Sequence, residues 1–559
     1  MSFSDCFSQH FSLALAAASI PDMPHARVSG FMIGTGVMAL FLAVILAPLG
    51  QLAYSRSLRR LVKLRQIEDA PVTLWTRRGA RLRAPSAAQR LNSMPLAEAS
   101  RVRERRIQRA TWVSYGMFVV YGFGVMQAFK TDRELEDSAL VLCYLVGMTF
   151  GPAAVNMAPY GFRRALMLVP LLIVALWSSV EPLSARTVAL AIGALLCLYV
   201  ITVHRTMRAV VLPLAVLCVS VGVSLGLGLW MFLADALRCR SPVYGPNDYQ
   251  AILGLLLLMA AVFVVLALCA ATVFLRVLVR IVERGWLSDI SLVAVCGVIV
   301  LGGFLTVGVE MRTTSAMNAL LFFGWVALTL GAYVVTLRTV TCPADSCTLL
   351  VLRVFSRGSK AERLLDALQN RWRLVGPVLE MGGPDLSRLN LELRGFLKFL
   401  SPGLFEILHP RGATEAAFRS SLDLAIDREG RFRINELFSF NSSWTSVLEH
   451  LLLLSDVVLL DLRGFNSERA GTTYELLRLG ALGRMGRVLT MYDSHTDWSY
   501  FDALLSKVVG LECGAPVRID ADSGDALRHC FEGLLQLAES ARDRRPTAVG
   551  PAPVSITPS

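Results

Sequence analysis

Long apolar runs between residues 30 and 338 constrain the fold of this chain more than any other feature. Most of them reach the ~20 residues that a helix needs to cross a hydrocarbon core of ~30 Å. Hydrophobic residues make up 54% of the chain and charged residues 18%, against about 45–50% and about 25% in soluble globular proteins. We therefore expect an α-helical polytopic membrane bundle of about nine transmembrane helices, with eight or ten as alternatives. The runs are 30–50, 111–129, 138–158, 165–180, 187–203, 209–234, 250–275, 289–309 and 316–337.

The basic residues lie mainly in the loops between these runs. The chain has 55 Lys and Arg against 43 Asp and Glu, a formal charge of +12. Most of the basic residues before position 340 fall on one side of the expected bundle, above all in a loop at 55–110. The positive-inside rule then predicts a multi-pass protein of the cell inner (plasma) membrane, with the N-terminus outside and the C-terminal domain in the cytoplasm. The expected partner is the lipid bilayer rather than nucleic acid.

The interiors of the expected spans carry almost no ionisable groups, which gives no support to a transport site. The pairs Gly30/Gly34 and Gly222/Gly226 fit close approach of helices, within one chain or between copies. Structural zinc needs four ligands, whereas the pair Cys342/Cys347 has no neighbouring His. No metal site is expected.

After residue 347 strand and helix patterns alternate, which predicts a doubly wound parallel α/β sheet over 348–543. An N-terminal segment at 1–29 and the membrane domain at 30–340 precede it, and a disordered tail at 544–559 follows. A less regular insertion covers 385–440. Strands are expected at 348–355, 374–381, 456–462, 487–492 and 516–519, and helices at 360–372, 444–454, 472–482, 498–507 and 523–541.

Doubly wound sheets bind ligands at the carboxyl ends of their strands, and two segments here follow strands in that way. In the first, backbone N–H groups and a helix N-terminus suit a phosphate group. In the second, a polar strand end leads through a glycine into the next helix. An aromatic side chain at 444 or 465 could stack on a base. The candidate nucleotide-binding residues are Ser356, Arg357, Gly358, Asp461, Gly464, Phe465, Gly471, Thr472 and Trp444.

The run S-D-V-V-L-L-D-L-R-G-F-(x)₅-G-T-T-Y-E-L, from Ser455 to Leu476, resembles nucleoside 2-deoxyribosyltransferases and related TIR-like nucleotide-binding domains. The run V-F-S-R-G-S-K, from Val354, is similar to the opening box of TIR domains. The resemblance covers about 348–543. It implies a flavodoxin-like fold, self-association through the domain, and Glu475 as catalytic residue. No cofactor is implied, because NAD would be the substrate.

Cleavage of an N-glycosidic bond passes through an oxocarbenium-like state, which a carboxylate in the first turn of a helix at 472–482 could stabilise or capture. Alternatively, Glu475 is a helix N-terminal charge favoured by the dipole. Arg357 and Asp461 fit structural roles, and the run 493–497 fits a turn with a helix cap better than a metal site.

Three functions stay open. The resemblance implies a membrane-anchored signalling or defence effector that binds, and in its enzymatic form hydrolyses, NAD or a related nucleotide. The second is a non-enzymatic membrane receptor or scaffold with a nucleotide- or partner-binding domain. The third is a channel or transporter gated by that domain.

Overall fold

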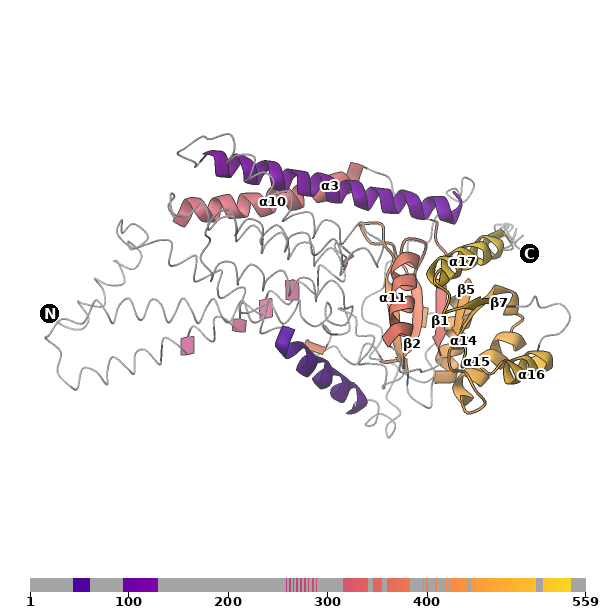
Figure 1. Cartoon of the computed structure of the whole chain (residues 1–559). Helices are drawn as coiled ribbons and strands as arrows, with labels where there is room; N and C mark the ends of the chain where they lie inside the picture. Colours follow the sequence, from indigo (N-terminus) through magenta and orange to yellow (C-terminus); the bar gives the residue numbers. More distant parts are fainter. Residues whose placement is uncertain are drawn as a thin grey trace, which may run out of the picture.

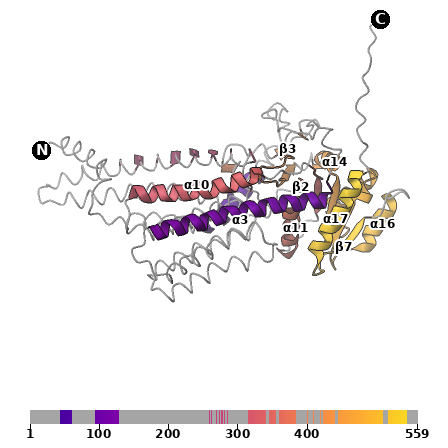
Figure 2. The same ribbon diagram turned by 90° about the horizontal axis from the view of Figure 1, so that it is seen from above.

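The structure is a computed structural model that contains a parallel α/β sheet with its helices, a pair of long helices, and a further helix at 44–60. The pair consists of α3 (Leu96–Ala128) and α10 (Ser315–Thr339), which run side by side away from the sheet (Figures 1 and 2). The described residues are 44–60, 94–128, 315–339, 345–353, 359–382, 422–439, 444–508 and 516–543, with single residues in 258–288 and 396–419.

The sheet has seven strands in the order β3-β4-β2-β1-β5-β6-β7, and every pairing is parallel. The chain passes from β1 to β2 on one side, and β5 then pairs with the other side of β1. The strand order therefore reverses between β1 and β5, the place where doubly wound sheets bind ligands. The strands are β1 (Leu349–Arg353), β2 (Val378–Gly382), β3 (Leu408–His409), β4 (Ile434–Ser439), β5 (Val457–Asp461), β6 (Val488–Tyr492) and β7 (Val517–Asp520).

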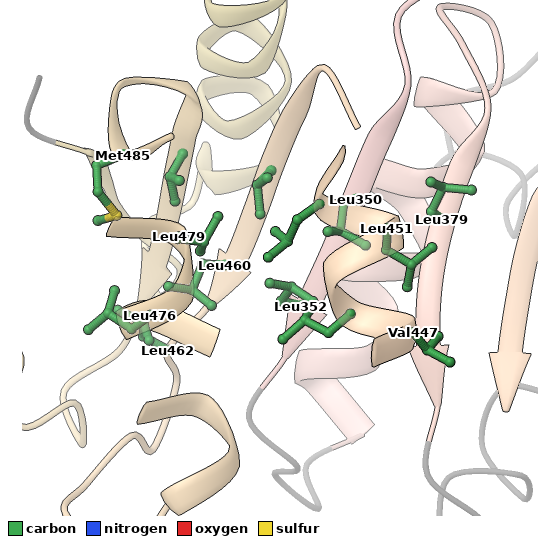
Figure 3. Packing of buried hydrophobic residues seen from close by; sticks show 14 of the residues in the cluster. Leu350, Leu352, Leu379, Val447, Leu451, Leu460, Leu462, Leu476, Leu479 and Met485 are labelled. Carbon is green, nitrogen blue, oxygen red and sulfur yellow. The ribbon is translucent and has the colours of Figure 1, made fainter. Parts of the chain in front are cut away.

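Helices cover both faces of the sheet, as parallel strands with buried faces require. On one face α11 (Ser359–Trp372) and α17 (Ala526–Asp543) pack on Leu349 and Val351 of β1. On the other face α14 (Trp444–Leu454), α15 (Ala470–Ala481) and α16 (Trp498–Val508) pack on Leu350 and Leu352. Figure 3 shows this second core, with side chains from α14 and α15 meeting those of β1, β2 and β5. All five residues of β1 are thus buried.

Each of the five strands and five helices predicted within 348–543 is present, with ends that differ by a few residues. The α/β part of the predicted fold is therefore confirmed. The expected irregular insertion at 385–440 is wrong in one respect, because it contributes β3 and β4 to the sheet edge beyond β2. β4 was hidden because its sequence, INELFS, places a buried polar residue, Asn435, within the strand.

The expected polytopic membrane bundle is wrong for the described part of the chain, in which no helix is long and apolar enough to cross a membrane. The run 111–129 is only the second half of α3, and the first half of that helix is rich in charged residues. The runs 138–158, 165–180, 187–203, 209–234 and 289–309 lie outside the described residues, as do 1–29, the tail 544–559 and most of the loop 55–110.

Two arginines one turn apart on α3 connect it to the other parts of the structure. The Arg103 side chain is fully buried, and its Nη1 donates to the carbonyl of Leu374 at 2.7 Å. Its guanidinium also lies over the Phe432 ring, 5.1 Å from the centroid. The Arg106 Nε donates at 2.9 Å to the carbonyl of Leu337, in the last turn of α10. α3 thereby joins α10 to the α/β domain.

Replacement of Arg103 by Met should destabilise the protein, because it leaves the buried carbonyl acceptors without a donor. We expect the free energy of unfolding to fall by about 2–4 kcal/mol, measured by urea unfolding of the full chain. Arg105→Met, at an exposed position of the same helix, is the matched control and should change it by less than about 0.5 kcal/mol. Equal effects of the two substitutions would contradict the joining role of Arg103.

Candidate functional site

The loops that follow β1 and β5 form the candidate site, since the strand order reverses between these two strands. The loop after β1 contains Ser356, Arg357 and Gly358, which lie outside the described residues. Their proposed contact with phosphate stays a prediction. The loop after β5 is described throughout, and it leads from Asp461 to the start of α15.

Asp461 ends β5 and is 2% exposed. Its two carboxylate oxygens accept hydrogen bonds from Arg463, Oδ1 from Nε at 2.8 Å and Oδ2 from Nη2 at 2.6 Å. A buried, bidentate arginine–carboxylate pair of this kind fixes local geometry. Asp461 therefore positions the loop, the structural role that its place in the sequence favoured.

Gly464 and Phe465 fix the course of this loop. Gly464 has a φ of +67°, a conformation that favours glycine, and its N–H donates to Asp493 Oδ1 at 3.0 Å. The Phe465 ring is fully buried and lies 5.7 Å from the ring of Tyr500 and 6.4 Å from that of Phe501. Its ring packs into the core, so that stacking on a base would require the loop to open.

Asp493 follows β6 and joins the loop after β5 to the loop after β6. The sequence did not predict this role. Besides Gly464, Asp493 Oδ1 accepts hydrogen bonds from the N–H of His495 and the hydroxyl of Thr496, each at 3.1 Å. Asp497 Oδ1 accepts the N–H of Tyr500 at 3.0 Å and so caps α16. The predicted turn with a helix cap is confirmed. Among the described residues, no group of three or more His, Cys, Asp or Glu could hold a metal ion.

Glu475 is the sixth residue of α15 and is 7% exposed. Its Oε2 is buried and has no hydrogen-bond partner. Burial raises the pKa of Glu475 from 4.5 to about 8, so that the side chain is mainly protonated at pH 7 in the structure as it stands. The expectation of a first-turn position is wrong, because α15 begins at Ala470, two residues before the predicted start. The helix dipole acts mainly on the first turn and does not explain this carboxyl.

Half-buried aromatic side chains gather in the first two turns of the helices that cover this face. Trp444 is the first residue of α14, and its ring meets that of Tyr474 edge-on, with centroids 5.1 Å apart. The hydroxyl groups of Tyr500 and Thr473 lie 3.4 Å apart. Each of these helices follows a parallel strand, so its first turn lies at the carboxyl edge of the sheet. Trp444 was predicted, whereas Tyr474 and Tyr500 were missed.

The start of α15 is open on its outer side. Gly471 is exposed, and no atom lies within 4 Å of where a Cβ would stand. Thr472 is buried one turn before Glu475, on the same face of the helix. α15 therefore presents an exposed glycine backbone near its start and an unpartnered carboxyl on its inner side.

A second buried polar group lies on the opposite face of the sheet. Arg353 at the end of β1 forms an ion pair with Glu380 of β2 through Nη2 and Oε1, and Gln369 Nε2 of α11 donates to Glu380 Oε2 at 3.1 Å. The signal was visible as an arginine in the apolar run TLLVLRVF, although its partner was not. This group ties the carboxyl end of β1 to the middle of β2.

In comparisons with known proteins, no family model, no curated protein and no solved structure matches this chain significantly. The resemblance to TIR-like and nucleoside 2-deoxyribosyltransferase domains therefore rests on the short runs in the sequence. The candidate site is therefore assigned from the arrangement of its own residues.

Replacement of Glu475 by Gln tests the state of this carboxyl without any ligand. A carboxyl group with a raised pKa in the folded state binds a proton that the unfolded chain has lost, so stability falls as pH rises from about 4.5 to 8 and then levels off. The Gln variant lacks this dependence. Relative to the unsubstituted protein, it should gain about 3–4 kcal/mol in unfolding free energy between pH 5 and 8.

The measurement is urea unfolding at pH 5, 6, 7 and 8. Glu468→Gln, at an exposed position before the same helix, is the control and should leave the pH dependence unchanged. A Glu475→Gln variant that follows the unsubstituted protein at every pH would mean that Glu475 is ionised at neutral pH.

Proposed function

We propose that the α/β domain binds NAD or a related nucleotide at the carboxyl edge of β1 and β5 and hydrolyses its N-glycosidic bond, with Glu475 as the catalytic residue. The buried carboxyl of Glu475, which has no partner for Oε2, is the observation that carries the proposal. An uncompensated buried carboxyl costs stability, and such groups cluster at functional sites. An ion pair would have favoured a purely structural role.

The charge state of Glu475 indicates how it would act. As the C1′–N bond breaks, its electron pair stays on the base nitrogen, and the Glu475 carboxyl can supply a proton to a base that leaves as an anion. The carboxylate that remains stabilises the positive charge on the ribose. Water then attacks C1′ and returns a proton to Glu475, which closes the cycle. A pyridinium such as the nicotinamide of NAD leaves as a neutral molecule and needs only the carboxylate.

Neighbouring groups give the ligand further contacts. Trp444 and Tyr474 offer partly exposed aromatic surface for a base, which favours binding by about 1–3 kcal/mol per stacked base. The open backbone around Gly471 lies at the N-terminal end of a helix, where negative charge is favoured. A nucleotide supplies both an aromatic ring and phosphate.

The second candidate is a non-enzymatic domain that binds a nucleotide or a partner domain. It is favoured by the pairing of Asp461 with Arg463 and by the burial of Phe465, since these leave fewer free side chains for catalysis. This function predicts ligand-induced stabilisation without product. Self-association through the domain remains part of both proposals.

Glu475→Gln should reduce hydrolysis at least about 100-fold. The amide cannot supply a proton to the leaving base and does not stabilise the developing positive charge on the ribose. The full chain is incubated with NAD and, separately, with purine nucleosides, and the released base is measured by chromatography. Glu468→Gln is the control. No turnover with any of these substrates, but a raised melting temperature, would favour the non-enzymatic domain.

The pH profile separates the two uses of Glu475. If it acts as an acid, the rate should fall as pH rises through about 8, and if it acts as a carboxylate toward NAD, the rate should rise toward that value. A rate independent of pH between 6 and 9 would contradict both.

Trp444→Leu should weaken nucleotide binding about tenfold, through loss of stacking. Trp498→Leu is a matched control, since Trp498 is the first residue of α16 and its ring contacts Tyr492 and Arg518 instead. Isothermal titration of the two variants with NAD provides the measurement. Equal weakening by both substitutions would exclude a specific role for Trp444.

A further inference from the structure

A pair of buried acidic side chains lies in the turn that precedes β4. This turn is at the amino end of the strand, whereas the candidate site is at the carboxyl ends of β1 and β5. Glu429 is fully buried and Asp427 is 7% exposed. No hydrogen-bond partner is found for Asp427 Oδ2 or for either carboxylate oxygen of Glu429. The candidate catalytic site uses neither residue.

The turn itself is held by one oxygen of Asp427. Asp427 Oδ1 accepts the N–H of Glu429 at 3.0 Å and that of Arg431 at 2.8 Å. Gly430 completes the turn with a φ of +95°. The backbone is thus fixed by Oδ1, which leaves Oδ2 available to carry a proton.

A distant part of the chain, the turn at Arg284 and Gly285 together with Ser288, contacts the 427–431 turn. The N–H of Arg428 donates to the carbonyl of Gly285 at 2.9 Å, and Arg431 Nη1 donates to Ser288 Oγ at 3.0 Å. A Cβ placed on Gly285 would stand 3.5 Å from both Cα and Cβ of Asp427. Asp427 therefore lies directly beneath this contact, and Ser288 is buried.

The charges around the pair favour a proton over a metal ion. Arg431 Nη1 lies 3.7 Å from Glu429 Oε2, and the guanidinium groups of Arg373 and Arg433 act electrostatically on Asp427. Arg433 also pairs with Asp423 at 3.2 Å, and Arg284 on the docked turn is exposed. A divalent cation would add two positive charges among these arginines, whereas a proton adds one and relieves the repulsion between the two carboxylates.

We propose that a proton held by Asp427, beside Glu429, locks the turn at Arg284 and Gly285 onto the 427–431 turn, so that the contact is tightest in acid and loosens toward neutral pH. The Asp427 carboxyl is buried and feels the charge of Glu429, so its ionisation in the docked state is costly. Loss of the proton leaves two adjacent negative charges beneath the docked turn. Undocking hydrates them and removes the repulsion.

The pH range follows from Asp427. Burial, followed by the charge of Glu429, raises the pKa of Asp427 from 3.8 to about 7 in the docked state. The undocked, hydrated carboxyl has lost its proton at those pH values. The docking constant should therefore fall as pH rises from about 4 to 7, by up to tenfold per pH unit, and should stay level above about 7.

Hydrogen exchange of the full chain tests this lock, because the Arg428 amide donates directly across the contact. Protection of this amide, corrected for the intrinsic pH dependence of exchange, should fall up to tenfold per pH unit from 5 to 7. Amides of β5 should keep their protection. Constant protection of Arg428 across this range would overturn the proposal.

Asp427→Asn should remove the pH dependence, because the amide keeps an oxygen acceptor at Oδ1 and cannot ionise. Asp502→Asn, on the exposed side of α16, is the matched control and should leave the dependence intact. An unchanged slope in the Asp427 variant would also overturn the proposal. If that variant fails to fold, Glu429→Gln should shift the loss of protection to lower pH, and an unchanged profile would count against the lock.

Ser288→Ala weakens the contact between the two turns and leaves the titrating carboxyl unchanged. Loss of the hydrogen bond from Arg431 should lower the protection of the Arg428 amide at every pH while its slope stays the same. A changed slope would mean that the docked turn, and not the acidic pair, carries the titrating group.

Discussion

The pairing of β1 with both β2 and β5 is the interaction on which the rest of the structure depends. β1 lies at the point where the strand order reverses, and its side chains alternate between the two helical layers. Because the strand is buried on both faces, the layers can form only if it is apolar over almost its whole length. Its single charged residue, Arg353, stands at the carboxyl end and is neutralised by Glu380. The candidate site therefore begins where the apolar part of β1 ends.

Sequence patterns predicted the α/β domain well because each of its central elements contains its own signal. The run DVVLLDL can be little other than a buried strand, and the helical face formed by Leu364, Leu365 and Leu368 defines α11. β4 was not predicted, because the polar residue Asn435 is buried within it and interrupts the apolar pattern. The backbone N–H of Asp423 donates to Asn435 Oδ1 at 2.8 Å. A hydrogen-bond partner twelve positions away cannot be predicted from a local sequence pattern.

The candidate site was predicted in part, for a related reason. A strand end, a glycine and a helix can be read from consecutive residues, which is how Asp461, Gly464 and Glu475 were found. Partners brought together by the fold were not visible, such as Asp493 for Gly464 or Tyr500 for Thr473. The apolar run at 111–129 misled the prediction for the described part of α3, because a run read on its own does not show that it continues a charged helix joined to the α/β domain.

The carboxyl groups of the domain fall into two kinds. Asp461 and Glu380 each lie against an arginine and have their oxygens occupied, so they hold the sheet edge together. Glu475, Asp427 and Glu429 each have at least one buried oxygen without a hydrogen-bond partner. A paired carboxylate contributes to folding, whereas an unpaired one weakens it unless a proton or a ligand compensates. The second kind marks the positions at which this domain can respond to its surroundings.

The continuity of α3 has a mechanical consequence. Its 33 residues span about 50 Å at ~1.5 Å per residue. Arg103 and Arg106 lie on the same side of this rod, about one turn apart, and each is inserted into a different body. An axial twist applied at the Ala128 end must therefore turn both side chains together. The Arg103 side chain contacts the segment at Leu374, which leads into β2, the neighbour of β1.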